Sequence, residues 1–171
     1  MTEAQVPLLF VVVLRLAIGG GLIWEGWGKV RQGYLQKSVM RRADLTNPFR
    51  ATLKMWMEEE RTVYWRGGET GQSRSFHMFP WYRFFLERAV LPSVYLFAII
   101  VTICELVLGC LLIIGLLVRV ASVVGIVLGV NYLLATWHYG FPYTTLNGLF
   151  ITSLVVLLLT GAGRAAGVDA I

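Results

Sequence analysis

The sequence has few charged residues for its length. Of its 171 residues, 15% are Asp, Glu, Lys or Arg, whereas 57% are hydrophobic. Soluble globular domains carry about 25% charged residues, which keep their surfaces hydrated. The composition therefore excludes a water-soluble domain and predicts an integral membrane protein.

Cysteine and histidine are also scarce, with two of each. Cys104 and Cys110 lie six positions apart in one hydrophobic run, so a helix would place them on different faces and they could not bridge each other. His77 belongs to a polar stretch, and only His138 adjoins a hydrophobic run. These residues are too few for a bis-histidine haem, a zinc site or an iron–sulfur centre. We expect no metal site and no covalently bound cofactor.

Two further sequence signals are missing. The N-terminus has no basic segment and no small-residue cleavage site, so we expect the first hydrophobic run to remain as an anchor. The Gly-Ala-Gly at 161–163 is followed by no acidic ribose-binding residue, which excludes a dinucleotide fingerprint.

The positive charges are unevenly distributed along the chain. The net charge is +5, but 12 of the 15 basic residues lie between the first two hydrophobic runs. Such clustering is typical of a cytoplasmic loop, so nucleic acid is not an expected partner.

Four hydrophobic runs are long enough to cross a bilayer as helices. They span about residues 6–24, 92–118, 120–137 and 144–161. Because the later connections are short, we predict an all-α, four-helix transmembrane bundle that forms a single membrane domain over residues 1–171. Gly125 and Gly129 form a small-residue pair that predicts close contact with another helix.

A charged, Trp-rich insert at about 30–91 separates the first two runs. Asn47 and Pro48 form an N-cap and first-turn pair that predicts a short helix extending to Val63. Phe79-Pro80 predicts a second short helix, whose aromatic side chains would lie at the membrane surface. The insert is either a solvated loop with surface helices or a docking surface for partner chains. The positive-inside rule predicts that it is cytoplasmic and that both termini lie on the opposite side.

Two ionisable residues, Arg15 and Glu105, lie deep in the first and second runs. A charge at such depth costs several kcal/mol unless it has a partner. With Glu25 and Pro92 placed at the same membrane edge, the depths of the two residues differ by only about 5 Å. We therefore predict an Arg15–Glu105 contact inside the bundle. The pair is either structural or a catalytic pair in which Glu105 accepts protons.

Polar residues also gather at the insert side of the bundle. Glu25, Lys29, His138 and Asn147 are predicted to lie near one another there. An aromatic belt at the membrane interface explains the neighbouring Trp and Tyr residues, but it does not require these four. They can hydrogen-bond a quinone, and His138 could titrate near neutral pH. We predict that they form a site for a quinone head group.

Three parts of the chain carry residues in a distinctive pattern. The second run contains Pro92, Glu105, Gly109, Gly115 and Arg119, the first run contains Arg15, Gly19, Gly26 and Lys29, and the C-terminal tail contains the Gly-Ala-Gly-Arg at 161–164 with Asp169. With these residues the second run is similar to the second span of DoxX-type proteins, and the first run and the tail resemble the corresponding parts of the same family. The long charged insert departs from the family pattern.

The resemblance implies a subunit of the DoxX/DoxD group in the inner membrane of a prokaryote. Members of this group are linked to thiosulfate:quinone oxidoreductase, which implies a quinone-linked oxidoreductase subunit, with a sulfur compound as one possible electron donor. The alternative is a non-catalytic accessory subunit packed in a larger respiratory or photosynthetic complex. Membrane lipids are expected partners, together with other subunits that contact the insert and the aromatic helix surfaces.

Overall fold

The computed structural model describes residues 8–42, 44, 46–57, 78–139 and 141–162, apart from the side chains of Leu8 and His138. Four helices in this part of the chain are long and apolar enough to cross a membrane. They are α1 (Leu8–Arg31), α5 (Val94–Ile114), α6 (Val118–Thr136) and α7 (Phe141–Leu159). The described residues contain no strand. The predicted all-α fold with four membrane helices is confirmed.

Two helix boundaries differ from the sequence prediction. Helix α1 continues to Arg31, seven residues beyond the predicted end at 24. The turn between α5 and α6 uses Gly115 and Leu117, with φ angles of 75° and 51°, so Arg119 lies inside α6 and not in the turn. Gly115 ends α5 in the left-handed conformation that glycine adopts without a steric penalty.

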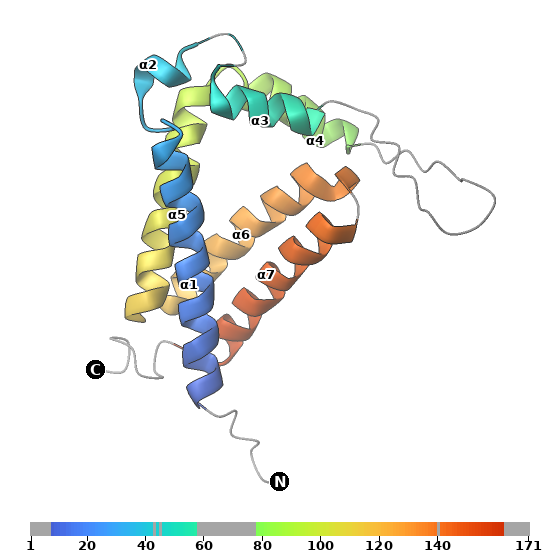
Figure 1. The fold of residues 1–171 in the computed structure, drawn as a ribbon. Helices are drawn as coiled ribbons and strands as arrows, with labels where there is room; N and C mark the ends of the chain where they lie inside the picture. The colour runs from blue at the N-terminus through green and yellow to red at the C-terminus, as the bar shows by residue number, and fades with distance from the viewer. Residues whose placement is uncertain (1–7, 43, 45, 58–77, 140, 163–171) are drawn as a thin grey trace, which may run out of the picture.

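The long helices form two closely packed pairs, α1 with α5 and α6 with α7 (Figure 1). The pairs diverge from the α5–α6 turn, and α1 begins at the same end of the molecule at which α7 ends. Glycines permit the close approach within each pair. A Cβ atom on Gly109 would lie 2.7 Å from the Gly19 carbonyl oxygen, and one on Gly125 would lie 2.9 Å from Leu154 Cδ1. The predicted close contact at Gly125 is therefore confirmed, with α7 as the partner helix.

Short helices cover the wide end of the bundle. They are α2 (Lys37–Met40), α3 (Pro48–Met57), α4 (Pro80–Phe85), the π-helical turn η1 (Leu86–Val90) and the 3₁₀ turn η2 (Trp137–Tyr139). The predicted cap of α3 is confirmed, because Asn47 Oδ1 accepts hydrogen bonds from the backbone N–H groups of Phe49 (3.0 Å) and Arg50 (3.1 Å). The predicted end of this helix at Val63 lies outside the described residues.

The short helices pack onto the membrane helices through a hydrophobic cluster. Phe49 and Leu53 of α3 and Tyr82 of α4 are buried in it, together with Val94 and Ala98 of α5. The Tyr82 hydroxyl donates to the backbone oxygen and Oδ1 of Asn131 in α6. Burial raises the pKa of Tyr82 to about 12. The described part of the insert is thus packed into the fold.

Candidate functional site

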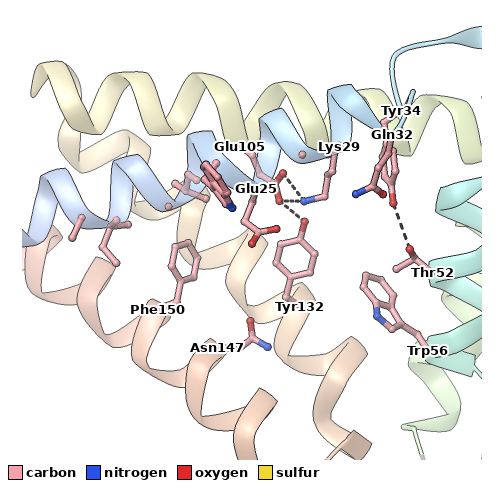
Figure 2. A pocket seen from close by; sticks show the side chains of 16 residues that line it. Glu25, Lys29, Gln32, Tyr34, Thr52, Trp56, Glu105, Tyr132, Asn147 and Phe150 are labelled. Carbon is pink, nitrogen blue, oxygen red and sulfur yellow. Dashed lines mark hydrogen bonds and ion pairs between the residues drawn. The ribbon is translucent and has the colours of Figure 1, made fainter.

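A polar pocket of about 630 Å³ lies between α1, α3, α6 and α7 (Figure 2). Its volume falls in the range of about 300–1,000 Å³ that is usual for small-molecule sites. The side chains that give it polar character are Glu25, Lys29, Gln32, Tyr34, Thr52, Glu105, Tyr132 and Asn147. Ionisable groups inside a membrane-spanning bundle are costly, so their concentration around one cavity marks a candidate site.

One edge of the polar pocket is formed by a three-residue network drawn from three helices. Lys29 Nζ of α1 lies 2.5 Å from Glu105 Oε1 and 2.6 Å from Oε2. The Tyr132 hydroxyl of α6 donates to Glu105 Oε1 at 2.5 Å. The Glu105 side chain is only 2% exposed, so its charge is balanced inside the protein by Lys29. Figure 2 shows all three side chains meeting at one edge of the pocket.

The predicted partner of Glu105 was wrong. Arg15 does not meet Glu105; its Nη1 donates to the backbone oxygen of Ala162, just beyond α7, at 3.0 Å. Arg15 is 2% exposed, so it is buried as predicted. A carbonyl near a helix C-terminus is a suitable acceptor, because the last carbonyls of a helix lack partners within the helix.

The error came from the register of α1 against α5. The prediction placed Glu25 level with Pro92, whereas a Cβ atom on Gly26 would lie 3.2 Å from Glu105 Cβ. This is a shift of about 13 residues, or about 20 Å along the helix. Lys29 lies about one turn beyond Gly26 and reaches Glu105, while Arg15 is about three turns away toward the other end.

The four residues that were predicted to bind a quinone head group differ in where the structure places them. Glu25, Lys29 and Asn147 line the polar pocket. Glu25 makes no hydrogen bond or ion pair with the described residues, and Figure 2 shows its carboxylate pointing into the cavity. The Asn147 amide nitrogen donates to Thr136 Oγ1 (2.9 Å) and to the backbone oxygen of Tyr143 (3.0 Å). The side chain of His138 lies outside the described part of the chain, so its place in the site stays a prediction.

Helix α3 and the turn after α1 form a side of the polar pocket that was not predicted. Thr52 and Trp56 of α3 line the polar pocket together with Tyr34. The Tyr34 and Thr52 hydroxyls lie 3.4 Å apart, and burial raises the pKa of Tyr34. Thr52 and Trp56 are four residues apart on a helix whose cap was predicted, so their common face was visible in the sequence. The sequence did not indicate what this face would contact.

The described residues include no group of three or more His, Cys, Asp or Glu side chains placed to hold a metal ion. Cys104 and Cys110 are free thiols. At the polar pocket, the side chains of Lys29, Glu105, Tyr132 and Glu25 supply hydrogen-bond donors and acceptors.

Comparison with known proteins identifies the family. A family model described as TQO small subunit DoxD matches residues 76–171, which is more than half of the chain. The match covers α4 to α7 and includes Glu105, Tyr132 and Asn147 of the polar pocket. No curated protein and no solved structure matches the chain. With four membrane helices and this match, the chain belongs to the DoxD family of membrane proteins.

Proposed function

We propose that this chain is a membrane subunit of a quinone-linked oxidoreductase complex and that its polar pocket binds the quinone head group. The observation that carries the proposal is the Lys29–Glu105–Tyr132 network beside Glu25 in a cavity within the membrane helices. The description of the DoxD family as a TQO small subunit supports it. A lipid-soluble substrate can reach such a cavity from the bilayer.

The polar groups suit both redox forms of a quinone. Lys29 has three N–H groups, and Glu105 accepts from Nζ with both oxygens, so one N–H is left to donate to a quinone carbonyl. Asn147 uses its amide nitrogen within the protein, so its oxygen is left to accept from a quinol hydroxyl. Glu25 can deliver or remove a proton at the ring, because no described group neutralises it.

The reaction needs an electron donor besides this chain. Reduction of a quinone to a quinol takes up a pair of electrons and a pair of protons. We propose that the electrons come from a partner subunit that oxidises a small donor, such as a sulfur compound, and that Glu25 passes protons from the insert side. The partner would contact the insert and the exposed aromatic surface of α4, where Trp81 is 59% and Phe84 62% exposed.

The proposal places the protein in a prokaryotic inner membrane. The insert would face the cytoplasm, and both termini would lie on the other side. The basic residues of the insert support this orientation through the positive-inside rule.

The proposal is tested by replacing Glu25 in the purified complex. Glu25→Gln should lower quinone-dependent turnover about 100-fold, the usual size of a general acid–base contribution, and leave quinone affinity nearly unchanged. Because Glu25 makes no hydrogen bond or ion pair with the described residues, the variant should remain folded. Thr152→Val is the control, since Thr152 is exposed on α7, outside the insert, and does not line the polar pocket.

A different result would favour the accessory-subunit alternative. If the wild-type protein in lipid nanodiscs binds no benzoquinone, and gentle purification yields only structural lipids in the bundle, the proposed function is wrong. Equal turnover of the Glu25→Gln and Thr152→Val complexes would remove the proton role of Glu25.

A further inference from the structure

A second cavity lies on the other side of the Lys29–Tyr132 contact. This apolar chamber, of about 340 Å³, is bounded by α3, α4, η1, α5 and α6. The chamber is lined by apolar side chains, among them Phe49 and Leu53 of α3, Phe97 and Ile100 of α5, and Val124 and Leu128 of α6. Its volume is large enough for a small-molecule group.

The apolar chamber adjoins the polar pocket. Five side chains line both cavities: Lys29, Tyr34, Thr52, Trp56 and Tyr132. The two spaces therefore share one wall of side chains, with ionisable groups on one side and hydrocarbon on the other. One ligand with a polar head and an apolar extension could occupy both.

Most of the polar groups that line the apolar chamber already have partners within the protein. The Tyr82 hydroxyl donates to Asn131. The Lys29 ammonium is directed at Glu105, and the Tyr34 hydroxyl lies beside Thr52. A polar occupant would lose its own hydrogen bonds to water without finding replacements there, which is unfavourable. The chamber therefore suits a hydrocarbon group.

Some residues that line the apolar chamber are also exposed on α5 and α6. These helices diverge from their common turn (Figure 1), and the chamber lies toward the wide end, beneath the short helices. Its lining residues Ile100, Val124 and Val127 are 46%, 40% and 66% exposed. Because exposed apolar side chains on membrane helices face lipid, we take these residues as the mouth of the chamber.

We propose that the apolar chamber holds the isoprenoid tail of a quinone whose head group lies in the polar pocket, and that the tail enters between α5 and α6. This inference rests on the proposed function, since the head group fixes where the tail begins. It adds a specificity: the site selects quinones that carry an isoprenoid tail over tail-less ones.

The test uses two ligands and two pairs of variants, each in lipid nanodiscs. The ligands are a benzoquinone without a tail and the same benzoquinone with a short isoprenoid tail. Ile100→Trp and Val124→Trp place a large ring at the mouth. Ile103→Trp and Val123→Trp are matched controls, because these residues are 47% and 49% exposed on the same helices and do not line the chamber. Each ligand partitions into lipid to the same extent with every variant. Comparing the variants with one ligand at a time therefore removes the effect of partitioning on the measured affinity.

Each mouth variant should raise the dissociation constant of the tailed quinone about tenfold, as expected when a few methylene groups lose their burial. The tail-less quinone should bind all variants like the wild type, and the control variants should bind both ligands normally. Unchanged binding of the tailed quinone to the mouth variants would overturn the chamber proposal alone and indicate that a lipid acyl chain fills the space. Equal weakening of both ligands would also overturn it. If neither ligand binds the wild type, the proposed function fails as well.

Discussion

Helix α1 carries a basic residue toward each of its ends, and the two differ in the acceptor they meet. Near its start, Arg15 donates to a backbone carbonyl at the end of α7. Near its end, Lys29 pairs with the carboxylate of Glu105 beside a cavity. A carbonyl cannot change its charge, whereas a carboxylate can gain or lose a proton. The described contact of Arg15 links α1 to the residue just beyond α7, whereas that of Lys29 links α1 to α5 beside the pocket in which we propose that the quinone head group binds.

The largest expected effect comes from breaking the ion pair at the Lys29 end. Glu105→Gln leaves Lys29 without its counter-charge, so the free energy of unfolding should fall by about 4 kcal/mol, as for other buried pairs that lose one partner. Denaturant unfolding in detergent measures the loss. The double variant Glu105→Gln with Lys29→Met should recover more than half of it. A loss no larger than that of the exposed control Glu87→Gln would show that the pair is not buried in the membrane.

The next effect tests the register that brings Lys29 to Glu105. Gly109→Ala places a methyl group against the Gly19 carbonyl and the backbone nitrogen of Ile23, so α1 and α5 must separate. We expect a loss of about 3 kcal/mol in the free energy of unfolding and weaker quinone binding. Gly20→Ala is the control, since a methyl group there meets no atom within 4 Å. Similar stabilities for both variants would disprove the tight α1–α5 contact.

A smaller effect is expected at the Arg15 end. Arg15→Met removes a charged hydrogen bond, which should cost about 2 kcal/mol of unfolding free energy. Quinone affinity should stay within about twofold of the wild type, because Arg15 does not line the polar pocket. Arg31→Met, at an exposed position on the same helix, serves as the control. A loss of quinone binding in Arg15→Met with stability intact would contradict the division between the two ends.

The smallest expected effect is on how the free energy of unfolding changes with pH, through Tyr82 at the Lys29 end. The pKa of Tyr82 is raised from 10.0 to about 12 by burial, so the folded state favours the neutral phenol. This stabilisation is complete below pH 10 and is lost as the pH rises toward 12. Between pH 10 and 11, the wild type should lose about 1 kcal/mol more unfolding free energy than Tyr82→Phe. Identical pH profiles would show that Tyr82 is hydrated; Tyr95→Phe controls for the other tyrosines.

The sequence was sufficient for the membrane helices and insufficient for their register. Long hydrophobic runs report which segments cross the bilayer, because the energy of exposing polar groups to lipid depends on composition alone. The position of Glu105 beside Lys29 depends on glycine contacts between α1 and α5, and these are decided by shape. Using Glu25 as the membrane edge assumed that α1 ends there, whereas it continues to Arg31.

The candidate site was partly predictable for the same reason. Glu25, Lys29 and Asn147 stood out as polar residues beside hydrophobic runs, and all three line the polar pocket. Tyr132 and Trp56 did not stand out, because aromatic residues are common at membrane interfaces. Only the packing of α3 against α5 and α6 brings Trp56 to the cavity.

The fully buried Asn47 connects two neighbouring short helices of the insert. Its amide nitrogen donates to the Met40 oxygen at 2.7 Å, and its oxygen caps α3, so one side chain ties the α2 segment to the start of α3. Thr52 and Trp56 lie further along α3, so the position of its N-terminus sets where their side chains lie. A replacement such as Asn47→Leu would therefore displace Thr52 and Trp56 from the polar pocket, although Asn47 itself does not line it.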